Sequence, residues 1–250
     1  MPVLATPLGR AMLGERAGRT TIDPATLTLL FDYNAADLAL SEGNAVASWP
    51  DSSGNAFDLA QATGTKQPTY RADAINGVPG VEFDGGDVLT GTVNYGGVQG
   101  ATLFAVVKSG DSQDMVAEFN TVGNPGWFFY HNAGAFDLKV TVTGGASERT
   151  ATTDDTTHFW IVEFVWDGTL AGNELIVASN GNAAGSFVIN DNTSNTLGSA
   201  TLHVGGRGTV PDLPMTGVLV RLLGAAEAWT PARREGVRYW LADWVDLAVL

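Results

Sequence analysis

The residues best suited to acid–base chemistry are Glu82, Asp84 and Asp87, which lie in one short segment. Alternation along a β-strand puts residues two apart on the same face, so Glu82 and Asp84 could serve as the paired carboxylates of a retaining glycoside hydrolase. That chemistry needs rigidly held carboxyl groups about 5–5.5 Å apart. The Gly85-Gly86 pair interrupts the strand before Asp87. The segment therefore favours a noncatalytic role, and a glycoside hydrolase is a remote alternative.

Nucleophilic catalysis has no recognisable set of residues in this chain. Cysteine is absent, no Gly-x-Ser-x-Gly elbow occurs, and no glycine-rich motif opens a predicted helix. The three histidines, His131, His158 and His203, lie on separate predicted strands without a catalytic signature. We interpret His203, beside Gly205, as a side chain at a strand end rather than as a base. No catalytic residues are expected, and the protein is predicted not to be an enzyme.

Calcium is the one metal for which the chain offers suitable ligands. Ca²⁺ takes oxygen ligands from loops, and Asp51, Asp84 and Asp87 lie in predicted turns. None belongs to a self-contained D-x-D-x-D-G loop, so several loops would have to assemble the site. The alternative is that Asp51 and Asn55 shape their turn by hydrogen bonds to their own backbone. No other cofactor is expected.

A glycan site needs an exposed aromatic face and a few fixed polar groups. Trp127 follows the loop residues 124–126, and Tyr130 and His131 lie close to it in the sequence. These three residues are the predicted glycan-binding set. The alternative is that Trp127 is a core residue of an apolar strand.

Strands must position all of these residues. Short apolar or alternating runs recur through the chain, mostly separated by Gly, Asn, Asp or Thr clusters. The runs are 27–31, 45–49, 80–83, 101–108, 127–130, 136–142, 158–166, 173–178, 201–205 and 215–223. The run 101–108 is nearly all apolar, which predicts a central strand covered on both faces.

A helix is predicted only at the C-terminus, over residues 231–248. Thr230 is a good N-cap and Pro231 suits the first helical position. Apolar residues recur there at spacings of three and four: Val237, Trp240, Leu241, Trp244 and Val245. Three arginines are expected on other faces: Arg233, Arg234 and Arg238. The tryptophan stripe should pack on the body of the protein.

Because no helical pattern separates the strands, the sequence predicts an all-β fold, a two-sheet antiparallel sandwich. A chain of 250 residues with 44% hydrophobic content can bury a large core, which must replace the missing disulfides. We expect one domain over residues 26–250, which includes the C-terminal helix.

Residues 1–25 are predicted to form an extended N-terminal arm, because they show weak periodicity and several Gly and Pro residues. Its apolar and basic residues are Leu4, Leu8, Arg10, Met12, Leu13, Arg16 and Arg19. Residues 1–22 have a net charge of +2, whereas the remainder has −16. The arm is interpreted as a segment that orders on a partner or a neighbouring subunit, and a floppy terminus is the alternative.

The charge of the whole chain argues against a nucleic-acid partner. The net charge is −14 and only three lysines are present, whereas phosphate binding needs clustered Lys and Arg. The N-terminus lacks the pattern of a secretory signal, and no segment approaches the roughly 18 apolar residues of a membrane span. We expect a soluble protein, made in the cytoplasm, with no membrane partner.

Residues 46–89 contain the most specific pattern. The turn from Trp49 to Asn55 reads Trp-Pro-Asp-Ser-Ser-Gly-Asn, and it is followed by Gln-Pro-Thr-Tyr ending at Tyr70 and Val-Glu-Phe-Asp-Gly around Phe83. Later, Leu-His-Val-Gly-Gly-Arg ends at Arg207. In order and spacing this pattern resembles bacterial and phage LamG-like domains. The resemblance implies a concanavalin A-type jelly roll over about residues 26–248, with Trp49, Tyr70 and Phe83 in the core.

LamG-like domains of this single-domain type often occur in phage particles. The resemblance therefore implies a noncatalytic virion component, either a capsid decoration protein or a tail or fibre subunit. Its partners would be capsid or tail proteins and further copies of the chain, as a trimer or a dimer. The alternative is a carbohydrate-binding or adhesion module that binds surface glycans.

Overall fold

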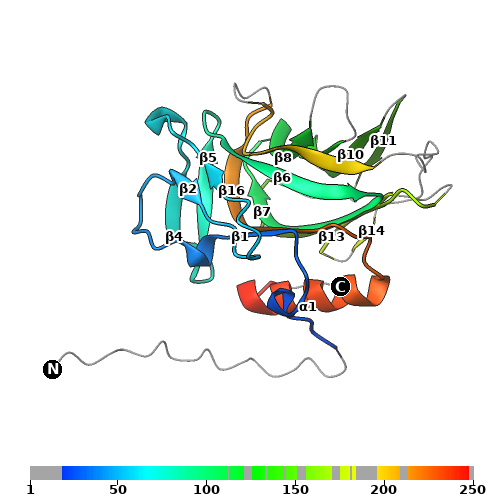
Figure 1. Cartoon of the computed structure of the whole chain (residues 1–250). Coiled ribbons are helices and arrows are strands. Elements are labelled where there is room, and N and C mark those ends of the chain that lie inside the picture. Colours follow the sequence, from blue (N-terminus) through cyan, green and yellow to red (C-terminus); the bar gives the residue numbers. More distant parts are fainter. Residues whose placement is uncertain are drawn as a thin grey trace.

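A computed structural model shows two antiparallel β-sheets packed face to face, with a helix against one of them (Figure 1). The structure describes residues 19–111, 113–120, 126–132, 135–142, 145–150, 156–170, 175–180, 182–183, 196–208 and 213–247. Within these residues each sheet has eight strands. The predicted all-β, two-sheet antiparallel sandwich is confirmed, and its architecture is a jelly roll.

Sheet A is the sheet that contacts the helix. Its strand order is β14-β13-β12-β7-β16-β5-β4, and β1 and β5 pair with successive parts of one edge of β16. The strands are β1 (Phe31–Asn34), β4 (Thr69–Ile75), β5 (Val78–Asp84), β7 (Gly100–Ser109), β12 (Trp160–Asp167), β13 (Leu175–Ser179), β14 (Asn182–Ala183) and β16 (Thr216–Ala225).

Sheet B lies on the other side of the inter-sheet core, with the order β11-β10-β9-β8-β15-β6-β3-β2. Its strands are β2 (Ser48–Trp49), β3 (Leu59–Ala60), β6 (Leu89–Val98), β8 (Gln113–Asn120), β9 (Gly126–Asn132), β10 (Ala135–Val142), β11 (Gly145–Thr150) and β15 (Leu197–Val204). The helices are α1 (Pro231–Val245) and the short 3₁₀ turns η1 (Pro24–Thr26), η2 (Ala35–Asp37) and η3 (Gly64–Lys66).

Strand β7 is the central strand that its apolar run predicted. It lies between β12 and β16, and Leu103, Ala105 and Val107 point into the core between the sheets. The alternate residues Phe104 and Val106 join a second core on the outer face of sheet A. The helix α1 covers this second core, so β7 is buried on both faces, as predicted.

A β-bulge in β16 fits one strand to both cores. Leu219 pairs with Val107, whereas the next paired residue is Arg221, so Val220 is the extra residue. In a regular strand Leu219 and Leu222, which are three residues apart, would face opposite sides of the sheet. The bulge lets both leucines point into the inter-sheet core, while Arg221 faces α1.

Most predicted strands are confirmed, and the exceptions have physical reasons. In the run 27–31 only Phe31 belongs to a strand, because Leu27 and Leu29 pack into the α1 core instead. The run 45–49 is reduced to β2 and one isolated bridge. The long strands β4, β6 and β8 were not predicted, since β6 is rich in Gly and Thr and β8 carries two acidic residues.

The inter-sheet core is built largely from aromatic residues. Trp49, Tyr70 and Phe83 are buried, as expected from the sequence. A chain of ring contacts of 4.8 to 5.9 Å links Tyr95, Phe119, Trp127, Phe164, Phe129 and Phe136 across the two sheets. This core supplies the cohesion that disulfides provide in other small folds.

The helix α1 begins and ends much as predicted. The Thr230 side chain accepts a hydrogen bond from the Arg233 N–H, and Pro231 occupies the first helical position. At the other end, the amide of Asn76, from the β4–β5 turn, donates to the carbonyl of Val245 at 2.9 Å. The helix is thus held at both ends, once by its own cap and once by sheet A.

One prediction about α1 is wrong. Arg234 and Arg238 do not face away from the core but are buried against sheet A. Each donates to a different carboxylate oxygen of Glu163 on β12, at 3.1 Å in both cases. The ion pairs explain why two charged residues can share the buried face of the helix with Val237 and Leu241.

The described part of the predicted arm docks along α1. The Ile22 N–H donates to the Gly236 carbonyl at 2.9 Å, and the Arg19 guanidinium lies 4.4 Å from the centre of the Tyr239 ring. A Cβ at Gly236 would lie 2.6 Å from Ile22 Cγ1, so the helix needs glycine there. The remaining arm residues, Leu4, Leu8, Arg10, Met12, Leu13 and Arg16, lie outside the described residues, and their docking role stays a prediction.

Candidate functional site

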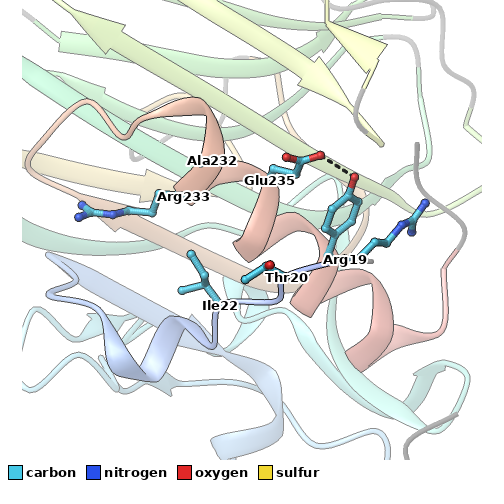
Figure 2. A pocket seen from close by; sticks show the side chains of 7 residues that line it. Arg19, Thr20, Ile22, Ala232, Arg233 and Glu235 are labelled. Atoms are coloured by element: carbon cyan, nitrogen blue, oxygen red, sulfur yellow. Dashed lines mark hydrogen bonds between the residues drawn. The ribbon is translucent and has the colours of Figure 1, made fainter. Parts of the chain in front are cut away.

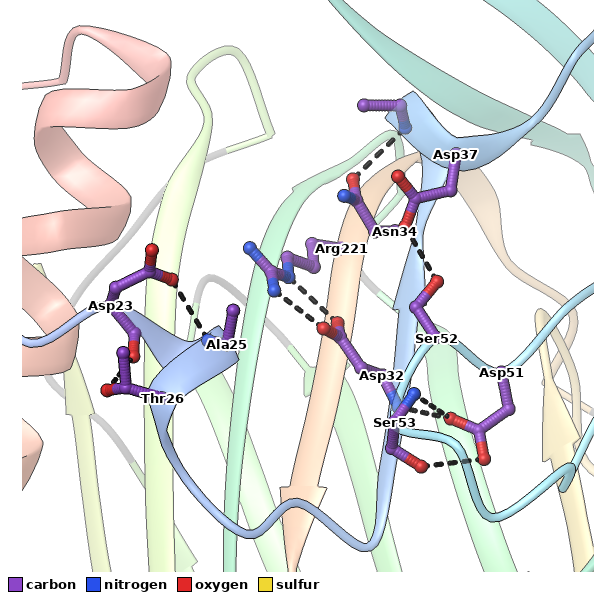
Figure 3. A network of polar contacts seen from close by, with 11 residues as sticks. Asp23, Ala25, Thr26, Asp32, Asn34, Asp37, Asp51, Ser52, Ser53 and Arg221 are labelled. Carbon is purple, nitrogen blue, oxygen red and sulfur yellow. Dashed lines mark hydrogen bonds and ion pairs between the residues drawn. The ribbon is translucent and has the colours of Figure 1, made fainter.

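Asp51 anchors the turn that follows β2. Its carboxylate accepts hydrogen bonds from the backbone N–H groups of Asp32 and Ser53 and from the Ser53 hydroxyl, at 2.8 to 2.9 Å (Figure 3). It also accepts from the Phe57 N–H at 3.1 Å. Asn55 continues this role, since its amide donates to backbone carbonyls of the chain before β1. These four donors engage both carboxylate oxygens, so the structure shows Asp51 as a turn-forming residue and does not present it to a cation. The turn-forming alternative is confirmed.

Directly beside this turn lies a buried ion pair that the sequence did not predict. Arg221 Nε and Nη2 donate to the two carboxylate oxygens of Asp32 at 2.8 and 2.6 Å (Figure 3). The rings of Trp240 and Trp244 lie 5.3 and 5.5 Å from the same guanidinium. The pair ties β1 to β16 and lies under α1, so it serves the fold.

Asp84 and Asp87 form a second self-contained turn. Asp87 Oδ2 accepts from the Asp84 N–H at 3.0 Å, and Asp84 Oδ1 accepts from the Gly86 N–H at 2.9 Å. Burial, with a smaller contribution from the neighbouring Asp84 charge, raises the pKa of Asp87 to about 6. In the part of the chain that the structure describes, no three acidic or histidine side chains are grouped to hold a metal ion. Asp51, Asp84 and Asp87 are therefore not brought together as a calcium site.

Glu82, the first carboxylate of the hydrolase alternative, is engaged in an ion pair. Glu82 accepts from Arg71 Nε at 2.6 Å, and Arg71 also pairs with Glu42 at 2.9 Å. Glu82 and Asp84 thus have separate structural partners. Nothing in this segment holds them as a catalytic pair.

The predicted glycan platform at Trp127 is not exposed. Trp127 is 1% exposed, and its indole N–H donates to the Tyr95 hydroxyl at 3.0 Å inside the inter-sheet core. His131 is fully buried with its Nδ1 2.9 Å from the Asp111 carbonyl, and Tyr130 is half-buried. The alternation of β9 turns Trp127 inward, which is the alternative that the sequence left open.

A cavity of about 410 Å³ lies between α1 and the N-terminal segment (Figure 2). Its polar lining is already engaged. Arg233 pairs with Glu227 at 2.5 Å, and the Tyr239 hydroxyl donates to Glu235 at 2.6 Å. The cavity is best described as the seat of Ile22 and its neighbours on the helix.

A different polar cluster lies on the outer face of sheet B, the face turned away from the inter-sheet core. It consists of Glu118 on β8, His203 on β15, and Arg207 with Gly208 just after β15. Glu118 Oε2 accepts from the Gly208 N–H at 3.0 Å and lies 3.9 Å from His203 Nδ1. Arg207 Nε is 3.9 Å from Glu118 Oε1, and its guanidinium lies 5.3 Å from the centre of the Phe128 ring on β9.

Two glycines allow the chain to place Arg207 over the sheet. Gly205 has φ +92°, and a Cβ there would overlap the ring of Phe83. The Val-Gly-Gly-Arg and Val-x-Phe-Asp-Gly patterns therefore meet in space. Gly208, at φ +69°, turns its N–H toward Glu118. Sequence reasoning found the segment, but it treated His203 as a strand-end side chain and Arg207 as part of a fold signature.

The electrostatics of the cluster are balanced. Burial lowers the pKa of His203, an effect that the Glu118 charge opposes, so the imidazole is neutral at pH 7. The charges of Glu118 and Arg207 compensate each other. The cluster is thus a neutral patch with both hydrogen-bond donors and acceptors, in a chain whose net charge is −14.

Comparison with known proteins identifies the fold but no family. No family model and no curated protein sequence matches the chain. Among solved structures, the receptor-binding domain of botulinum neurotoxin D has a TM-score of 0.61 at 10% identity, over 86% of this chain and 53% of that one. The neurotoxin D domain with N-acetylneuraminic acid gives 0.60 at 10% identity, over 85% and 51%. The neurotoxin DC domain with rat synaptotagmin II gives 0.54 at 11% identity, over 81% and 51%.

The chain spans about half the length of these neurotoxin domains. At this identity the likeness defines the class only: a jelly-roll sandwich of the architecture that these binding domains contain. The resemblance to LamG-like domains remains one of motifs and fold. No helix in the described part of the chain has the length and apolar character that a membrane crossing requires.

Proposed function

We propose that the chain is a noncatalytic binding module, attached through its N-terminal residues, that presents the outer face of sheet B. The observation that carries this proposal is the seat of Ile22 on Gly236, because it fixes where the preceding residues leave the sandwich. The helix α1 lies on sheet A, so this attachment point and the outer face of sheet B lie on opposite sides of the molecule (Figure 1).

The noncatalytic part of the proposal is supported by the engagement of the acidic residues. Glu82 is paired with Arg71, and Asp84 and Asp87 cap their own turn. The binding part is supported by architecture, since neurotoxin domains of similar fold were solved with a sugar or a protein receptor bound. In a phage virion, such a module would be a capsid decoration protein or a tail or fibre subunit that docks through residues 1–25. This setting comes from the motif resemblance alone.

The attachment can be tested on particles from the source that encodes the chain. One antibody would be raised against a peptide of residues 1–18, and another against the folded protein. If the N-terminal residues are held in an assembly, only the second antibody labels intact particles in electron micrographs, and both label dissociated particles. Recovery of the protein only as a free monomer, never with a particle, would overturn the proposed attachment.

The absence of catalysis has its own test. Wild type and Glu82→Gln are incubated with β-glucans, and products are analysed by mass spectrometry. We expect no hydrolysis by either protein. Turnover by wild type that is lost in Glu82→Gln would show a glycoside hydrolase instead.

A further inference from the structure

The outer face of sheet B carries aligned side chains, of which Glu118 and Phe128 are buried, His203 is largely buried, and Thr92 and Asn94 are exposed. Register pairs His203 with both Thr90 on β6 and Glu118 on β8, and Glu118 with Phe128 on β9, so these residues form one row across four strands. A neighbouring row pairs Thr201 with Thr92, followed by Ser199 with Asn94. Neighbouring strands are about 4.8 Å apart, so hydroxyl and amide groups recur at short, regular intervals.

Two groups, Arg207 above the first row and His203 within it, lack hydrogen-bond partners in the described part of the chain. The Arg207 guanidinium makes no hydrogen bond there, since its 3.9 Å approach to Glu118 is too long for one. It is nevertheless held in place by Glu118 and by the ring of Phe128, and its side chain is 46% exposed. His203 Nδ1 is buried with no partner, in a side chain that is 11% exposed. A ligand can reach Arg207 but not the buried His203 Nδ1, so Arg207 is the group that a ligand would satisfy.

The charges restrict what that ligand can be. An anion would be attracted by Arg207 but repelled by Glu118 and by the net charge of −14. A cation would be attracted by the net charge but repelled at short range by Arg207, which is the exposed member of the cluster. A hydroxyl group can accept from Arg207 and donate to an oxygen or nitrogen acceptor at the same time. Adjacent hydroxyls on one uncharged molecule meet these requirements best.

We propose that the outer face of sheet B binds uncharged glycans, with Arg207 as the principal donor to sugar hydroxyls. Arg207 lies beside Glu118 and Phe128 of the first row, and Thr90, Thr92 and Thr201 extend the surface along β6 and β15. This inference rests on the proposed function as a binding module and assigns its ligand class. It replaces the platform predicted at Trp127, which lies in the core.

A glycan array with labelled wild-type protein tests the ligand class. The array carries neutral oligosaccharides and their sialylated counterparts. We expect binding to neutral glycans that is weakened about tenfold or more in Arg207→Ala, as for loss of a charged hydrogen bond. Arg233→Ala is the matched control, because Arg233 is 40% exposed and also paired with a glutamate, but it lies on α1. It should bind like wild type.

Thr92→Arg provides a second variant, because Thr92 is exposed and its replacement blocks the surface without touching the core. It should also lose binding at an unchanged melting temperature. The proposal is overturned if wild type binds no neutral glycan, if it binds only sialylated ones, or if both variants bind like wild type. None of these outcomes affects the antibody test of the N-terminal attachment, so the two proposals fail separately.

Discussion

Four hydrogen bonds converge on the Asp51 carboxylate, and this convergence explains the composition of its turn. Ser53 supplies two of the donors, and Gly54, at φ +91°, lets the chain reverse. Acidic side chains in this protein repeatedly accept N–H groups of their own turn, as Asp84 does for Gly86. Many carboxylates that look available for metal binding are therefore occupied by backbone donors.

Asp87 provides a residue-scale prediction with a defined pH dependence. Its raised pKa, about 6, means that the folded state binds the proton more tightly than the unfolded state. The favourable contribution is fully present below the ordinary aspartate pKa of 3.8 and is lost as pH rises through about 6. Asp87→Asn keeps the acceptor for the Asp84 N–H and removes the buried charge. We expect it to raise the free energy of unfolding at pH 8 by about 1–2 kcal/mol.

Urea unfolding at pH 8 and pH 4 measures this difference, which should shrink at the lower pH. Asp243→Asn, an exposed substitution on α1, is the control and should change little at either pH. Equal stability of wild type and Asp87→Asn at pH 8 would contradict the prediction.

At the scale of elements, the contact between α1 and sheet A depends on Glu163. Two buried arginines share this carboxylate, and the Nε atoms of Arg234 and Arg238 have no hydrogen-bond partner in the described structure. Glu163→Ala would leave two buried positive charges without a counter-charge. Removing one partner of a buried pair costs about 3–5 kcal/mol, so we expect a loss of that size in urea unfolding.

Two further variants separate charge from packing in this contact. Glu235→Ala removes an exposed acid from the same helix and should cost far less. Replacing Glu163, Arg234 and Arg238 together by Leu or Met should restore much of the stability, because an apolar set needs no counter-charge. If Glu163→Ala is as stable as wild type, the ion pairs do not hold α1.

The sequence predicted elements where a local signal sufficed. Thr230 and Pro231 marked the start of α1, and the apolar run of β7 marked a central strand. The strand β6 was not predicted, because its outward residues Thr90, Thr92 and Asn94 alternate with inward residues that include glycine, which weakens the apolar pattern. The positions of Arg234 and Arg238 were predicted wrongly, because arginine is rarely buried without an ion-pair partner. Their partner Glu163 lies on another element, far away in the sequence, so no local pattern indicated the pair.

At the scale of the whole molecule, Asp32 and Arg221 join the first and the last strand of sheet A. Both side chains are buried, and two hydrogen bonds connect them. Asp32→Ala leaves a buried guanidinium unpaired, so we expect the free energy of unfolding to fall by about 3–5 kcal/mol in urea titrations.

Glu42→Ala breaks the exposed pair with Arg71 and serves as the control, with a much smaller expected loss. Equal losses in the two variants would contradict the importance of burial for the Asp32–Arg221 pair.

The sandwich could be predicted from the sequence, whereas the candidate site could not. The site forms only when β8, β9 and β15 pair, which brings Glu118, Phe128 and His203 into one row. Strand alternation states which residues share a face of one strand, but not which strands are neighbours. The Asp32–Arg221 pair could not be predicted for the same reason, because the pairing of β1 with β16 is not visible in either strand alone.

The pairing of β1 with β16 also sets an order of events on the translating ribosome. Asp32 and Arg221 are 189 residues apart, and at about 5–20 residues per second the second strand follows the first by roughly 10–40 s. Throughout that interval Phe31 and Tyr33 have no partner strand, and Leu222 of the inter-sheet core has not yet been made. Sheet A can close only after β16 has been made, so until then the nascent chain exposes an apolar edge that chaperones would have to shield.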